Sequence, residues 1–132
     1  MGLTVFWNFK DRIFQIDANF GLTAAVLEML VYSNRDTIGI LPALPGKWDR
    51  GGIAGVLTRC GAEVDIDWDM PEGRITVKLT AKRTRTCTLR FPGAVASVVS
   101  PSGAQITPSP LGANCRRVTL QAGETMVLEV KI

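Results

Sequence analysis

The strongest constraint on the fold is a run of alternating apolar and acidic side chains, followed by a turn and a second alternating run. Val64, Ile66 and Trp68 alternate with acidic residues, residues 71–73 read Pro-Glu-Gly, and apolar positions resume at residues 75–81. Alternation with a period of two is typical of a strand with one buried face and one solvated face. The two runs therefore predict a β-hairpin that covers a core with one face.

Further strand-like runs follow this hairpin at residues 87–91, 95–99, 104–107, 118–120 and 126–132. The runs at 95–99 and 104–107 flank Pro101-Ser-Gly103, which predicts a second hairpin. About seven short strands at this spacing are typical of two packed sheets. The sequence therefore predicts a mainly β fold, an antiparallel β-sandwich of about seven strands preceded by one apolar helix.

The predicted helix occupies the N-terminal third of the chain, over residues 20–33. Asp17 and Asn19 are residue types that cap helix N-termini. One face of the helix is apolar at Phe20, Ala24, Leu27, Leu30 and Val31. Val26 and Met29 make the opposite face apolar as well. Because a helix that is apolar on all sides is normally buried on all sides, we expect it to pack against something beyond a small sandwich.

A connector with two prolines follows the predicted helix. Pro42 and Pro45 exclude a long helix and a central strand at residues 38–45, and we expect an extended segment there. Beyond it we expect a loop through Trp48 and Gly51-Gly52. This predicts two parts: residues 1–45, a leader with the helix and connector, and residues 46–132, the sandwich domain.

Composition excludes several function classes. The chain of 132 residues has a net charge of +3 with dispersed basic residues, which disfavours a nucleic-acid surface. No run reaches the roughly 18 apolar residues that a membrane span needs. The absence of histidine excludes Ser-His-Asp and Cys-His catalysis within the chain and removes the commonest zinc ligand. We predict no metal, no cofactor, no nucleic acid and no membrane among the partners. No signal-peptide pattern occurs in the chain, and the compartment is left open.

Three further features have competing interpretations. Glu63, Asp65, Asp67 and Asp69 place same-face carboxylates roughly 6.6–6.8 Å apart, a spacing at which a catalytic acid and base can flank a substrate and which could also suit calcium. Any polar strand face gives this spacing, so we interpret the row as a solvated face. The cysteines at positions 60, 87 and 115 lack close spacing, and we interpret them as small buried apolar side chains. We expect Trp68 to lie in the core and Trp48 to pack the connector onto the sandwich.

Three motifs in order resemble a known enzyme family. Residues 14–21 read FQIDANFG and lead into a helix ending in EML, residues 40–48 read ILPALPGKW, and residues 55–68 read GVLTRCGAEVDIDW. This order resembles the C-terminal part of glycoside hydrolase family 95, which contains α-L-fucosidases and α-L-galactosidases. Ala18 departs from the family pattern, which usually has glycine there.

The resemblance implies an inverting glycosidase with an (α/α)6 barrel followed by a C-terminal β-sandwich. Asp17 would be the aspartate that activates an asparagine base, although helix capping is the alternative from the residues alone. Gln15 and Asn19 would contact sugar hydroxyls, with local hydrogen bonds as the alternative. The general acid and the asparagine base lie upstream in the family. The predicted helix would then be the last helix of the barrel, and the parent family is often secreted or periplasmic.

We therefore expect a C-terminal fragment of a fucosidase-like glycoside hydrolase that is inactive alone, whose parent acts on a fucosylated or galactosylated glycan. An alternative is a β-sandwich interaction or carbohydrate-binding module that forms homo-oligomers through residues 20–33. A third option is a small enzyme that uses Asp17 with the acidic strand.

Overall fold

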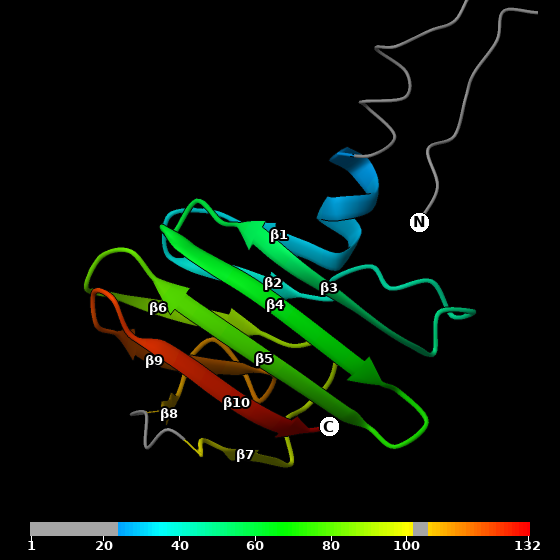
Figure 1. Cartoon of the computed structure of the whole chain (residues 1–132). Helices are drawn as coiled ribbons and strands as arrows, with labels where there is room; N and C mark the ends of the chain where they lie inside the picture. The colour runs from blue at the N-terminus through cyan, green and yellow to red at the C-terminus, as the bar shows by residue number, and fades with distance from the viewer. Residues whose placement is uncertain (1–23, 102–105) are drawn as a thin grey trace, which may run out of the picture.

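The computed structural model of the protein describes residues 24–101 and 106–132 as one short helix and ten strands (Figure 1). The helix covers residues 24–30. The strands are β1 Val31–Ser33, β2 Thr37–Ile40, β3 Arg50–Leu57, β4 Ala62–Asp69, β5 Arg74–Ala81, β6 Arg85–Arg90, β7 Ser97–Val99, β8 Ile106–Pro108, β9 Cys115–Leu120 and β10 Thr125–Lys131. Within the described residues, no helix is long and apolar enough to cross a membrane.

The strands form two five-stranded sheets stacked as a sandwich (Figure 1). The first sheet has the order β1-β2-β6-β9-β8, and the second has the order β3-β4-β5-β10-β7. The pairings are antiparallel except for β2 with β6, which run parallel. The mainly β sandwich predicted from the sequence is confirmed, with ten strands in place of about seven.

The core lies between the two sheets and follows the alternation seen in the sequence. On β4 and β5, burial alternates residue by residue along both strands. Val64, Ile66 and Val77 are fully buried, and β10 adds Leu128 and Val130 at 1% exposure each. Each fully buried aliphatic side chain stabilises the fold by about 1.5–3 kcal/mol relative to an exposed one. The predicted hairpin of β4 and β5 is confirmed, with Gly73 at the turn.

The structure corrects the predicted helix at its C-terminal end. Helical residues end at 30, and residues 31–33, predicted to be helical, form β1. The side chain of Asn34 closes the β1–β2 turn, since its Oδ1 accepts hydrogen bonds from the backbone N–H groups of Asp36 and Thr37 at 3.0 and 2.8 Å. This tight turn lets the β-branched Val31 pair with Ile40, and both side chains are buried.

Strands β2 and β3 correct the predicted connector and loop. Residues 37–40 form a strand inside the first sheet, and the strand ends before Pro42. Gly51 and Gly52, predicted to lie in a loop, belong to β3 at the edge of the second sheet. Glycine in a strand often marks a place where another group approaches closely, and here the side chains of Trp68 and Asp67 lie where Cβ atoms on Gly51 and Gly52 would be. Strands β1 and β2 thus precede the predicted domain boundary at residue 46, and the division of the chain into two parts stays a prediction.

The second predicted hairpin is wrong. Strand β7 pairs with β10 in the second sheet, whereas β8 pairs with β9 in the first sheet. The chain therefore changes from the second sheet to the first sheet between β7 and β8. Local turn residues indicate where a strand ends, but the partner of the next strand depends on which sheet has room for its apolar face.

One close contact explains a glycine on β3. Gly51 lies opposite Trp68 of β4, and a Cβ on Gly51 would come within 2.6 Å of the indole Cζ2. Trp68 is 7% exposed, as predicted for a core residue, and its Nε1–H donates a hydrogen bond of 2.8 Å to the Trp48 carbonyl oxygen. The indole therefore occupies the space that a side chain at position 51 would need.

We expect Gly51→Ala to lower the free energy of unfolding by about 1–3 kcal/mol, because the methyl group must displace a buried, hydrogen-bonded indole. Urea unfolding followed by tryptophan fluorescence measures the change. Gly46→Ala is the matched control, because a Cβ there meets no atom within 4 Å and should change stability by less than about 0.5 kcal/mol. Equal effects for both variants would contradict the role given to the Gly51 contact.

Candidate functional site

The residues predicted to carry catalytic and sugar contacts, Asp17, Gln15 and Asn19, lie outside the described residues. Their assignments stay predictions. Among the described residues, two surfaces offer hollows that could take a ligand or a partner. One is polar and lies on the outer face of the second sheet, and the other is apolar and lies at the helix and the loop after β2.

The acidic row of β4 lies on the outer face of the second sheet, as its alternation predicted. Two of its four carboxylates have basic partners across the strand pairs. Asp65 lies 3.8 Å from the Lys78 ammonium, and Asp69 lies 3.2 Å from Arg50 and 4.0 Å from Arg74. Exposed ion pairs of this kind contribute little to stability, which agrees with a largely solvated face.

Asp65 also holds an irregularity in the edge strand. The β3–β4 register shifts between Ile53 and Val56, and Gly55 has a φ of 73° there. The Asp65 carboxylate accepts a hydrogen bond of 2.8 Å from the Gly55 N–H, which the register shift takes out of the ladder. Bulges at sheet edges twist the strand and hinder pairing with other chains. Asp65 therefore has a structural role and is not free to bind a ligand.

Asp69 is fixed by its surroundings. Burial raises the pKa of Asp69, but the hydrogen bonds from Arg50 and from the Glu72 N–H, with the charges of Arg50 and Arg74, outweigh that effect and hold the pKa below its ordinary value. The pKa of Arg50 is raised in turn, chiefly by its hydrogen bond to Asp69. Asp69 is therefore an ionised acceptor at neutral pH and has the wrong protonation state for a general acid.

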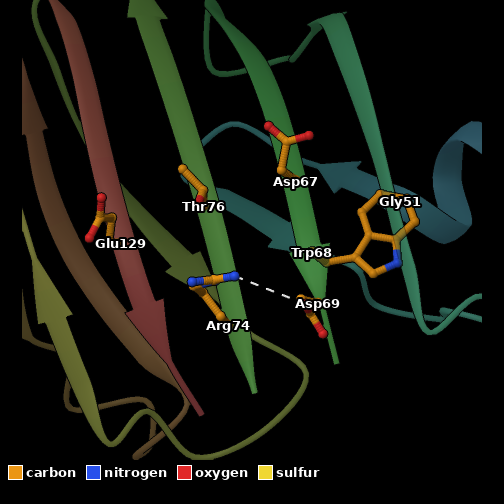
Figure 2. Close-up of a pocket in the computed structure, with 7 residues that line it drawn as sticks. All are labelled: Gly51, Asp67, Trp68, Asp69, Arg74, Thr76 and Glu129. Carbon is orange, nitrogen blue, oxygen red and sulfur yellow. Dashed lines mark ion pairs between the residues drawn. The ribbon is translucent and has the colours of Figure 1, made fainter. Parts of the chain in front are cut away.

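A polar hollow of about 420 Å³ lies beside this ion pair (Figure 2). Its lining comes from four strands: Gly51 of β3, Asp67, Trp68 and Asp69 of β4, Arg74 and Thr76 of β5, and Glu129 of β10. Asp67 is opposite Thr76, and Thr76 is opposite Glu129. Figure 2 shows these three side chains on neighbouring strands, with the Arg74–Asp69 pair to one side. The sequence predicted the acidic strand, but not the residues that β5 and β10 bring to it.

An apolar surface lies where the helix and the loop after β2 meet. Two hollows of about 300 and 310 Å³ share Pro42 and Ala43, and they extend to Tyr32 on one side and Trp48 on the other. Leu27, Tyr32 and Trp48 are 37%, 48% and 36% exposed. We call residues 24–32 together with residues 41–48 the apolar face. Trp48 lines one hollow and its carbonyl oxygen holds Trp68, which fits its predicted place between connector and sandwich.

The backbone joins the helix firmly to this loop. The N–H groups of Leu41 and Ala43 donate hydrogen bonds of 2.8 and 3.0 Å to the carbonyl oxygens of Leu30 and Met29. These are carbonyl groups at the end of a helix, which otherwise lack partners. The apolar face is therefore one connected surface.

The three cysteines are free and buried, as predicted for small core side chains. The Cys60 thiol donates a hydrogen bond of 3.0 Å to the Asn34 carbonyl oxygen, which ties the β3–β4 turn to the β1–β2 turn. Burial raises the pKa of Cys60 to about 12, and the neighbouring Cys87 adds to this rise. Burial also raises the pKa of Cys87. Thiols held in the neutral form are poor nucleophiles and poor metal ligands.

The described residues thus define a β-sandwich domain with one polar outer face and one apolar end. Within residues 24–101 and 106–132, no group of three or more Cys, Asp or Glu side chains is gathered as a metal site would require.

Comparison with known proteins identifies the family. Residues 32–128 match the glycoside hydrolase family 95, C-terminal domain. The chain therefore belongs to this family. Over 56 residues the chain is 54% identical to Alpha-L-fucosidase 2 of Arabidopsis thaliana, and the aligned region covers 42% of this chain and 7% of that protein. Over 66 residues it is 44% identical to Probable alpha-fucosidase A of Aspergillus oryzae, and the aligned region covers 42% of this chain and 9% of that protein. The chain thus spans less than a tenth of the length of these relatives.

The raised pKa of Cys60 predicts a loss of stability at alkaline pH. The folded thiol keeps its proton up to a pH of about 12. Its contribution to stability is therefore complete at any pH below the pKa of the unfolded thiol, and it is lost as the pH rises from there to the folded pKa. We expect Cys60→Ala to destabilise the protein at about pH 7 and the difference from wild type to shrink at about pH 10.5, measured by urea unfolding.

Val118→Ala is the control for this experiment. Val118 is fully buried and cannot ionise, so the cost of its truncation should be equal at both pH values. If the cost of Cys60→Ala is also independent of pH, the assignment of the raised pKa to Cys60 is wrong.

Proposed function

We propose that this chain is the C-terminal part of a fucosidase-like glycoside hydrolase and that it does not catalyse hydrolysis by itself. The observation that carries the proposal is the family match over residues 32–128, which concerns a C-terminal domain, together with the small share of each relative that the chain covers. In this proposal the longer protein acts on a fucosylated or galactosylated glycan.

The carboxylates on the described surface support the lack of catalysis. A glycosidase needs an acid that keeps its proton near neutral pH, usually in an enclosed apolar site. Asp67 and Glu129 are exposed on an open sheet face, and Asp69 is held ionised by two arginines. These side chains do not make the acid and base pair that the reaction needs.

The proposal gives Asp17 a role only in the longer protein. Asp17 would activate an asparagine base that lies upstream, with Gln15 and Asn19 near the sugar. Residues 1–45 would carry the end of the last barrel helix with its connector, and residues 46–132 would form most of the sandwich. The helix at residues 24–30, which is tied to the following loop by hydrogen bonds, would fix the sandwich rigidly to the barrel.

The apolar face supports a structural role. Tyr32 and Trp48 line the two hollows and are exposed, and Leu27 is exposed on the helix at residues 24–30. Burying such side chains stabilises an interface in proportion to the apolar area removed from water. In the longer protein the preceding domain would cover this face.

Self-association is the second candidate function, and exposure of the apolar face is the observation that favours it. A chain without its preceding domain would bury the same face against a second copy. Homo-oligomers would then form through residues 20–33. Within the described part of this segment, Leu27 and Tyr32 are large apolar residues that are exposed.

We expect the chain to release no product above the blank from an aryl α-L-fucoside. The reason is that the family places the acid and the base upstream of these residues. The measurement is a chromogenic assay of the purified chain beside its Asp17→Asn variant. Turnover that the substitution abolishes would support the small enzyme that uses Asp17, and would overturn the proposed lack of catalysis.

We expect the chain to form dimers or larger oligomers, because the apolar face is otherwise in water. Light scattering over a range of concentrations measures the mass, and Leu27→Glu should shift it toward the monomer. Leu111→Glu is the matched control, since Leu111 is 62% exposed in the loop before β9 and away from the apolar face. A monomeric wild-type chain at all concentrations would rule out self-association.

A further inference from the structure

Two carboxylates in the polar hollow have no partner among the described residues. Asp65 and Asp69, on the same face, are held by a backbone N–H and by basic side chains. The side chains of Asp67 and Glu129 make no hydrogen bond or ion pair with any described residue, and both are exposed. The Asp67 carboxylate lies against the bare backbone of Gly52, in space that a Cβ would fill. The hollow thus presents free acceptors beside a bound ion pair.

The spacing of these groups follows from the register of the sheet. Asp67, Thr76 and Glu129 form one cross-strand row on β4, β5 and β10. Neighbouring strands lie about 4.8 Å apart, so the row spans about 10 Å. Arg74 lies two residues from Thr76 on the same face of β5, beside the middle of the row (Figure 2). The row therefore matches a ligand whose polar groups are spread along its length.

Charge and geometry argue against three ligand classes: calcium, anions and cationic peptides. A calcium ion needs six to eight oxygens that converge to 2.3–2.6 Å, whereas Asp67 and Glu129 are separated by an intervening strand. An anion would meet three carboxylates and one arginine in the lining. A cationic peptide would meet the Arg74 guanidinium, whose side chain is 63% exposed. A neutral ligand that both donates and accepts hydrogen bonds satisfies all of these groups.

We propose that the polar hollow is a binding subsite for a neutral saccharide. Ring hydroxyls donate hydrogen bonds to the carboxylates of Asp67 and Glu129, and the Arg74 guanidinium donates to ring or hydroxyl oxygens. Thr76, between them, both donates and accepts. Hydrogen bonds to charged groups are about twice as strong as neutral ones. Binding is weak, with a dissociation constant in the millimolar range, because the hollow is open and its aromatic lining residue, Trp68, is 93% buried.

The lining of the polar hollow includes none of the predicted site residues Gln15, Asp17 and Asn19, and saccharide binding there does not require the chain to dock on a barrel or to form oligomers. Failure of saccharide binding would leave the proposed structural role intact. Conversely, loss of the apolar-face interaction would leave the hollow able to bind.

The test is a titration of the isotopically labelled 132-residue chain with lactose and, separately, with methyl α-L-fucopyranoside, followed by amide chemical shifts. We expect saturable shifts at residues 67, 76 and 129. Asp67→Ala and Glu129→Ala should each weaken binding about tenfold, the loss expected for one hydrogen bond to a charged group. Both side chains are exposed, so the variants should keep the wild-type fold. Glu63→Ala is the matched control, because Glu63 lies on the same face of β4 outside the hollow, and it should bind like wild type.

Three results would overturn the proposal. The first is the absence of saturable shifts with either saccharide, and the second is equal weakening by Glu63→Ala and Asp67→Ala. The third comes from calcium chloride alone. If calcium shifts the same amides, a chelator reverses the shifts and the saccharides have no effect, the hollow is a cation site.

Discussion

Burial of one face of the strand pair β4–β5 is the constraint on which the rest of the structure depends. Val64, Ile66 and Val77 are fully buried between the sheets, and the same strands carry their polar residues outward. A slip of one residue in this pairing would move every apolar side chain to the solvent face. The register that protects the core therefore also sets which carboxylates, hydroxyls and guanidinium groups meet on the outer face.

The alternation predicted this hairpin, the buried Trp68 and the outward acidic row, because each depends on a pattern that neighbouring residues carry. Pairing between distant segments could not be predicted in the same way. The parallel pairing of β2 with β6 joins residues about fifty positions apart, and it places Ile38 and Leu89 in register at 0% exposure. Long-range partners are chosen by the fit of buried faces, which propensity and turn residues do not determine.

The candidate surfaces show the same division. The acidic residues of β4 are visible in the sequence, but Thr76 and Glu129 join Asp67 only through the β4–β5–β10 register. The sequence signal for the apolar face was the helix with apolar residues on every side. The structure added the loop after β2 to that face, because Pro42 and Ala43 line one hollow with Tyr32 and helix residues and a second hollow with Trp48. Gln15, Asp17 and Asn19 were predicted as site residues from the family motif alone.

The two surfaces differ in the work that each can do. Water competes well for the polar groups of the outer sheet face, so that face stays hydrated until a ligand offers hydrogen bonds of equal quality. The apolar face has no such compensation, and its free energy falls when any well-fitting apolar surface covers it. Because the helix end is tied by backbone hydrogen bonds to the loop at residues 41–43, a partner on this face would hold the whole sandwich in a fixed orientation. In the proposed longer protein, this coupling would transmit a contact at the helix through the loop at residues 41–43 to the first sheet.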